Sequence, residues 1–198
     1  MSSTRYAELR RFGVRTITTA QAASAWQVSI SAASKMLSAL ASAGLVEALR
    51  RGIWLLELGA SAEMLAEDVT APHPAYVSHV SALYSHSVID QVPAELHLAS
   101  SGEPGIRHTS RGDFRIHRLP PSLFGGFREE RGAKIATVEK ALFDWAYVSV
   151  VSGNPNARLP ETEWPERFVR AEVDRWLRRI ESDRVRTLTE NLISRRLK

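Results

Sequence analysis

Apolar residues between Thr18 and Gly44 recur at the three- and four-residue spacing that is typical of amphipathic helices. Thr18 is a helix-capping residue, and Gln21 three positions later completes the pattern of a capping box. A sharp turn is predicted at Val28, and Ser29 is placed to cap a second helix. Gly44 then stands where a helix end favours a left-handed residue. The core-facing positions of the second helix are Ala33, Met36, Leu37 and Leu40.

Two short apolar stretches after this helix predict a β-hairpin with a basic turn. Residues 45–49 and 53–56 are its expected strands, joined by Arg50, Arg51 and Gly52. Helix, turn, helix and hairpin in this order indicate a winged helix-turn-helix domain, in which a helix enters the DNA major groove and the hairpin contacts phosphates. We therefore predict DNA contacts from a set of polar and basic residues: Ser29, Ser31, Ser34, Lys35, Ser38, Arg50 and Arg51.

The exposed face of the second helix departs from the usual composition of a DNA-reading helix. It holds one cation, Lys35, among serines, whereas arginine is the commoner partner of guanine. Specificity would then come from hydroxyls, from the hairpin or from DNA shape. The alternative is a partner-binding module whose winged helix does not read DNA. Gln27 occupies a turn position where glycine would be less strained.

The rest of the chain mixes short strands with helices, which predicts an α+β fold of two domains. The first is expected over residues 1–70, with an opening helix at 4–12 and a closing helix at 61–69. A proline-containing linker at 70–74 precedes the second domain, residues 75–198. The elements expected there are a helix at 76–87, strands at 94–100 and 114–119, one or two strands within 127–135, a helix at 138–149 capped by Thr137, a loop at 152–165 and one or two arginine-rich helices.

Charge is distributed unevenly along the chain. Residues 1–58 hold seven Lys and Arg against three Asp and Glu, residues 59–164 hold nine against thirteen, and residues 165–198 hold ten against six. The basic first segment suits phosphate contact, and the acidic middle segment does not. In the last segment acids alternate closely with arginines, which favours a solvated helix face over a nucleic-acid patch.

Some classes are disfavoured by composition. The chain has no cysteine, which excludes disulfides and thiolate metal sites. No N-terminal stretch resembles a signal peptide and no apolar run is long enough for a membrane span, so we expect a cytoplasmic protein without a membrane partner.

Six histidines raise the question of a metal site, but their spacing does not indicate one. His79 and His86 are seven residues apart, while His97 and His117 lie on separate predicted strands. None shows the close spacing of a zinc site, so no metal and no cofactor is expected. His79 is interpreted as a buried, hydrogen-bonded residue.

Two acidic patterns invite a catalytic interpretation that we disfavour. Asp90 and Glu95, followed by His97, resemble a nuclease pattern in which the final residue should be lysine. In the helix at 138–149, Lys140 is expected to face solvent. Asp144 on the same helix is expected to pair with an arginine, for example from the strand at 114–119. We therefore expect no catalytic residues.

Three separated segments carry a resemblance to a known family. They are YVSHVSAL at residues 76–83, PAELHLA at 93–99 and TVEKALFD at 137–144. In this order, after a winged helix, they resemble the AbiEi-type antitoxins of bacterial type IV toxin–antitoxin systems. The resemblance covers roughly residues 15–150, and the segment beyond Asn154 has no counterpart in it.

The resemblance implies a DNA-binding transcriptional autorepressor that is also an antitoxin and has no catalytic activity of its own. The first domain would bind promoter DNA of its own operon. The second would counteract a cognate nucleotidyltransferase-like toxin, directly or indirectly. A homodimer on DNA is compatible with this implication.

Overall fold

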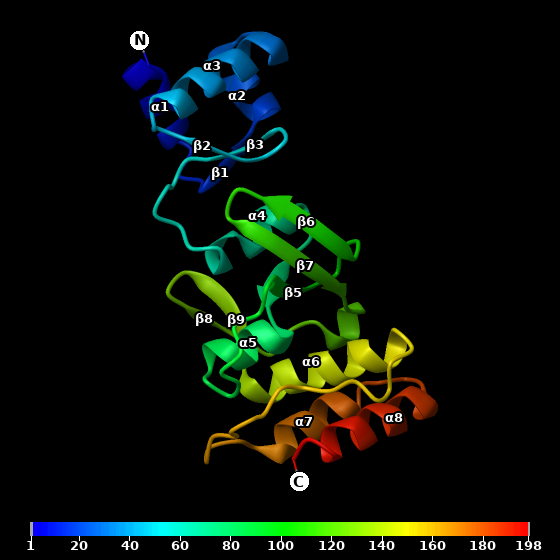
Figure 1. Cartoon of the computed structure of the whole chain (residues 1–198). Helices are drawn as coiled ribbons and strands as arrows, with labels where there is room; N and C mark the ends of the chain where they lie inside the picture. Colours follow the sequence, from blue (N-terminus) through cyan, green and yellow to red (C-terminus); the bar gives the residue numbers. More distant parts are fainter. Residues whose placement is uncertain (1, 198) are drawn as a thin grey trace. The chain divides into compact units, whose positions relative to one another are not determined.

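The computed structural model describes residues 2–197 and has an α+β fold with two separate sheets (Figure 1). The chain divides into two compact units. The first extends to Ser61 and includes the short segment His108–Gly112, and the second contains Ala62–Arg107 and the chain from Asp113 onward. Among the described helices, none is both long and apolar enough to cross a bilayer.

The first unit alternates helices with three short strands. In chain order the elements are α1 (Ser2–Arg10), β1 (Thr16–Thr18), α2 (Thr19–Trp26), α3 (Ile30–Ser42), β2 (Glu47–Arg50) and β3 (Ile53–Leu55). The strands form an antiparallel sheet with β3 in the middle, between β1 and β2. Strand β1 was not predicted, and it pairs Ile17 with Trp54.

Local side-chain contacts explain where α2 and α3 begin and end. The Thr18 hydroxyl accepts from the backbone N–H of Gln21 at 3.1 Å, and the Gln21 side chain accepts from the backbone N–H of Thr18 at 2.8 Å. The Ser29 hydroxyl accepts from the backbone N–H of Ala32 at 3.2 Å. Between the helices Gln27 has a left-handed φ of 54°, and Gly44 after α3 has a φ of 70°. These four sequence predictions are confirmed.

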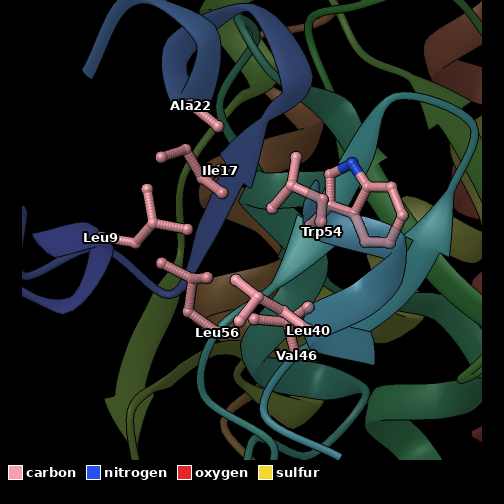
Figure 2. Close-up of a cluster of buried hydrophobic side chains, with 8 residues drawn as sticks. Leu9, Ile17, Ala22, Leu40, Val46, Trp54 and Leu56 are labelled. Carbon is pink, nitrogen blue, oxygen red and sulfur yellow. The ribbon is translucent and has the colours of Figure 1, made fainter. Parts of the chain in front are cut away.

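A cluster of apolar side chains forms a core of the first unit (Figure 2). It draws on helices and strands alike, and its buried members are Leu9, Ile17, Ala22, Leu37, Leu40, Val46, Trp54 and Leu56. The indole N–H of Trp54 donates to the hydroxyl of Thr19 at 3.0 Å, so the one polar atom of this large ring is satisfied. Leu37 and Leu40 fix which face of α3 is buried and therefore which face meets solvent.

The second unit is built on a six-stranded mixed sheet of order β6-β7-β5-β4-β9-β8. Strand β4 is central and pairs antiparallel with β5 and parallel with β9, while β5 pairs parallel with β7. The bounds are β4 (Ala75–Val77), β5 (Leu96–Ser100), β6 (Gly105–Thr109), β7 (Gly112–Arg118), β8 (Phe127–Glu130) and β9 (Ala133–Ala136).

Helix α6 is the structural centre of the helical layer in this unit. It packs against α5, α7 and α8, as Figure 1 shows. The hydroxyl of Thr137 caps its start by accepting from the backbone N–H of Lys140 at 3.3 Å. The helices of this unit are α4 (Ala66–Thr70), α5 (His79–Ser85), α6 (Val138–Val151), α7 (Arg170–Leu177) and α8 (Asp183–Ser194), with single 3-10 turns at Glu63–Leu65 and Pro121–Leu123.

Two expected helices differ from those in the structure. The predicted helix at 76–87 is shorter, because Tyr76 and Val77 belong to β4, and hydrogen bonds to strands on both sides hold them extended. The helix expected at 61–69 to close the first domain, whose end was placed at residue 70, belongs to the second unit. Its buried residues Leu65, Ala66 and Val69 lie on a 3-10 turn that contacts β9 and a helix that contacts β4.

Candidate functional site

The solvent-facing side of α3 is polar and carries most of the predicted contact residues. Ser29, Ser31, Lys35 and Ser38 are exposed, and Ser34 is half-buried. Next to the capping serine, Ile30 leaves 62% of its surface exposed. The first turn of α3 therefore presents one apolar side chain together with hydroxyls, and Lys35 follows about one turn later.

Two serines of α3 donate their hydroxyl hydrogens to the backbone of the helix itself. The Ser38 hydroxyl donates to the Ser34 carbonyl at 2.9 Å, and the Ser42 hydroxyl donates to the Ser38 carbonyl at 3.1 Å. A hydroxyl that donates to its own helix still has free lone pairs to offer outward. In this arrangement Ser38 would accept from the amino groups that adenine and cytosine present in the major groove.

The two hairpin arginines do not occupy equivalent positions. Arg51 is exposed in the turn, beside Gly52 with a φ of 78°. Arg50 ends β2 and is half-buried, and its Nε is a buried atom without a hydrogen-bond partner among the described residues. The pair was predicted as a unit, yet only Arg51 has a fully exposed position.

A second group of functional-type residues lies inside the second unit, around the carboxylate of Asp144. This carboxylate accepts from the Tyr76 hydroxyl at 2.8 Å and from the Ser78 hydroxyl at 2.7 Å. It also forms an ion pair with Lys140 one helical turn earlier. The Lys140 ammonium donates in addition to the Leu123 carbonyl at 2.7 Å. We call Tyr76, Ser78, Lys140 and Asp144 the buried polar cluster, because none of them is exposed.

This cluster corrects two sequence predictions. Lys140 does not face solvent; its side chain is fully buried, with the ammonium 4.2 Å from the ring centroid of Trp176. Asp144 pairs with Lys140 and not with an arginine of the 114–119 strand. The reason is tertiary packing, because α7 covers a face of α6 that would be exposed to solvent in an isolated helix.

Burial governs the protonation of the buried polar cluster. Desolvation raises the pKa of Asp144 and lowers the pKa of Lys140, while the attraction between the two groups opposes both shifts. The pKa of Tyr76 lies well above its ordinary value because of burial and the neighbouring Asp144 carboxylate. With its residues closed off from solvent, the cluster is suited to fixing α6 against β4 rather than to turning over a substrate.

The structure also brings three histidines together, which their spacing along the chain did not indicate. His79 starts α5, His97 lies on β5 and His117 on β7, and one ring nitrogen of each lies within 4.8 Å of the others. Nδ1 of His97 and Nε2 of His117 are 3.0 Å apart. The rings of His79 and His117 stack with centroids 3.9 Å apart. The grouping depends on the parallel pairing of β5 with β7 and on the contact of α5 with β5, and neither has a local sequence signal.

The residues of the nuclease-like pattern are engaged differently. The Glu95 carboxylate forms a bidentate pair with the Arg115 guanidinium, one contact being 3.0 Å long. Asp90 is exposed. Arg115 thus neutralises the acid that a catalytic metal would need.

The arginines of the C-terminal helices are interleaved with acids, as their spacing predicted. Arg170 pairs with Asp174 at 2.8 Å, Arg175 pairs with Glu172 at 3.0 Å, and Arg186 pairs with Asp183. Pairing of this kind leaves less unbalanced positive charge for phosphates.

No protein-family model matches the chain. No curated protein matches it significantly either.

Proposed function

We propose that the first unit is a winged helix that binds duplex DNA, and that the chain is a transcriptional repressor of its own operon. The observation that carries the proposal is the order α1-β1-α2-α3-β2-β3 with a β1-β3-β2 antiparallel sheet. This arrangement presents α3 with its apolar side buried and its serine-rich side in solvent. A helix so presented fits the major groove, with its N-terminal residues nearest the bases.

Within this proposal the residues of α3 and the hairpin have separate tasks. Ser31, Lys35 and Ser38 face base edges, with Ser29 and Ser34 beside them near the start of α3. Arg51 in the exposed turn grips a phosphate, and Arg50 supports it from the end of β2. Phosphate contacts set the affinity and the position of the protein along the duplex. The serine hydroxyls and Lys35 distinguish between bases.

The test uses the full chain and, as probe, the duplex immediately upstream of its own reading frame. Arg50→Ala/Arg51→Ala should weaken binding in an anisotropy titration. It should also flatten the plot of log affinity against log salt by about 0.9, because Arg51 makes one phosphate contact and each lost contact removes about 0.9 from the slope. Adding Lys35→Ala should weaken binding further.

The matched control removes the same charge elsewhere. Arg178→Ala/Arg184→Ala changes two exposed arginines of the second unit and should leave both affinity and salt slope unchanged. Equal losses in the two double variants would mean that net charge alone attracts the DNA. Binding by the hairpin variant that equals wild type at every salt concentration would refute the assignment of this face.

We further propose that the chain is an antitoxin of the AbiEi type, counteracting a nucleotidyltransferase-like toxin. The support is the resemblance and where its three segments lie. Tyr76 and Ser78 from the first segment meet Lys140 and Asp144 from the third in the buried polar cluster, and His97 of the second lies beside His79. The segments thus share one scaffold in the second unit.

Co-expression tests the antitoxin proposal separately from the repressor proposal. A toxin reading frame adjacent to this one should arrest growth alone and not when this chain is present. The Arg50→Ala/Arg51→Ala variant, with its weakened DNA binding, should still protect when expressed from an unrelated promoter. Failure of the wild-type chain to protect would remove the antitoxin role and leave DNA binding untouched.

One observation favours the alternative of a partner-binding winged helix. Ile30 exposes 62% of its surface at the start of α3, where a DNA reader would more often place a polar group. A partner would cover this side chain. The alternative predicts no binding to the upstream duplex at low salt, so the same titration decides between the two.

A further inference from the structure

The three histidines at the junction of α5, β5 and β7 have the composition of a metal site. They come from elements that are distant in sequence, and one ring nitrogen of each lies within 4.8 Å of the other two. We propose that His79, His97 and His117 together bind one divalent first-row transition-metal ion, for which Zn²⁺ is the reference. Imidazole nitrogen is a ligand that zinc, copper, iron and nickel all accept.

The distances are close to those that coordination needs. A Zn–N bond of 2.0–2.1 Å in tetrahedral geometry separates two ligand nitrogens by roughly 3.3 Å. The nitrogens of His97 and His117 are 3.0 Å apart, so their hydrogen bond opens by a few tenths of an ångström to admit an ion. The rings of His79 and His117 are stacked with an interplanar angle of 20°, so they would rotate on binding until their in-plane lone pairs converge on the ion.

A buried ring nitrogen of this group has no hydrogen-bond partner among the described residues. Nε2 of His79 is inaccessible to solvent and has no hydrogen bond among the described residues. A buried polar atom left unpaired is costly, and a metal bond would satisfy it. His79 also has a left-handed φ of 54°, a strained backbone state for a residue other than glycine that is commoner at binding sites than elsewhere.

The electrostatic surroundings suit neutral ligands. Burial lowers the pKa of His97 to about 4 and that of His117 to about 3, and it lowers the pKa of His79 well below its usual range. The rings therefore keep free lone pairs at neutral pH. The two nearby cations are each balanced by a carboxylate, Arg115 by Glu95 and Lys140 by Asp144.

Two of the three proposed ligands are partly accessible to solvent. His97 and His117 are only partly buried, whereas His79 lies behind them at 3% exposure. Three protein ligands leave a fourth tetrahedral position, which water would occupy as it does in open zinc sites. The site lies within the second unit and does not depend on DNA binding by the first.

The experiment measures metal binding by the full chain after removal of any affinity tag and treatment with a chelator. Zn²⁺ is titrated calorimetrically, and bound metal is counted after dialysis. We expect one ion per chain and a rise in melting temperature with free Zn²⁺, because the ion binds only the folded state. Co²⁺ in place of Zn²⁺ should give the visible absorption bands of a tetrahedral nitrogen-ligated ion.

Variants assign the ligands. His97→Gln and His117→Gln should each weaken Zn²⁺ binding by more than about tenfold, since losing an outer-shell partner of a ligand already costs that much. His108→Gln, at an exposed histidine outside the group, should bind like wild type. Circular dichroism in chelator verifies that each variant folds.

Two outcomes would overturn the proposal. One is wild-type protein that retains no Zn²⁺ after dialysis and shows no Co²⁺ bands, a measurement that holds even if both variants misfold. The other is Zn²⁺ binding that stays at wild-type affinity in both His97→Gln and His117→Gln, whatever the result for His108→Gln.

Discussion

Lys140 and Asp144 form an ion pair one helical turn apart on α6, and neither side chain has any exposed surface. Removing one partner of a buried pair leaves the other charge uncompensated. We therefore expect Lys140→Met to lower the free energy of unfolding in urea by about 3–5 kcal/mol. Asp144→Leu should cost at least as much, because the Tyr76 and Ser78 hydroxyls lose their acceptor as well.

The double variant and a surface pair provide the controls for that prediction. Lys140→Met/Asp144→Leu should cost less than the sum of its parts, with a coupling of about 0.5–3 kcal/mol. Lys134 pairs with Glu67 at 2.8 Å on the surface, so Lys134→Met should cost no more than about 1 kcal/mol. Equal costs for Lys140→Met and Lys134→Met would contradict the importance of burial.

Gln27 holds a left-handed conformation between α2 and α3. Such a conformation costs a residue with a Cβ roughly 1–2 kcal/mol, and glycine adopts it freely at an entropic cost of about 0.5–1 kcal/mol. Gln27→Gly should thus stabilise the chain by about 0.5–1 kcal/mol, measured as a higher melting temperature. Ala25→Gly, inside α2, should destabilise by a similar amount. Destabilisation by Gln27→Gly would show that its side chain makes a contact that outweighs the strain.

The depressed pKa values of His97 and His117 predict loss of stability in acid. In the unfolded chain both rings gain a proton near pH 6.5, while in the folded chain they stay neutral until about pH 4 and pH 3. Between these limits the unfolded state binds more protons. The free energy of unfolding therefore falls as pH drops from 6.5 towards 4, by up to about 1.4 kcal/mol per pH unit for each histidine.

Urea unfolding at several pH values in the presence of chelator measures this slope. His117→Gln should reduce it, because the variant lacks one of the titrating rings. Parallel pH profiles for wild type and His117→Gln would exclude His117 from the acid response.

The start and end of α2 and α3 could be predicted from sequence because their determinants are local. Thr18, Gln21 and Ser29 act within four residues of the backbone groups that they satisfy. Strand β1 was missed because its three residues are too few to show an alternation, and its partner β3 lies far along the chain. Tyr76 and Val77 matched a helical spacing, but pairing on both sides of β4 overrode it.

The interior of the second unit could not be predicted from local sequence in the same way. The local sequence indicates that Lys140 is a surface lysine, but in the folded chain it is buried where α7 packs on α6. His97 and His117 lie on two strands that are distant in sequence. The parallel pairing of β5 with β7 brings them together, with Ala99, two residues after His97, opposite His117. Such groupings depend on contacts between distant segments, whereas hydrophobic periodicity predicts only the local secondary structure of neighbouring residues.

The central place of β4 in its sheet has a consequence for synthesis on the ribosome. Val77 of β4 pairs in parallel with Ile135 of β9. The pairing of β4 with β9 can therefore form only after nearly sixty further residues have been translated. In contrast, Thr16 and Leu55 complete the N-terminal sheet early. Proteins rich in short-range contacts fold faster. A nascent chain stalled midway would therefore already hold its N-terminal sheet, while its second half still exposed an unpaired strand edge to chaperones and proteases.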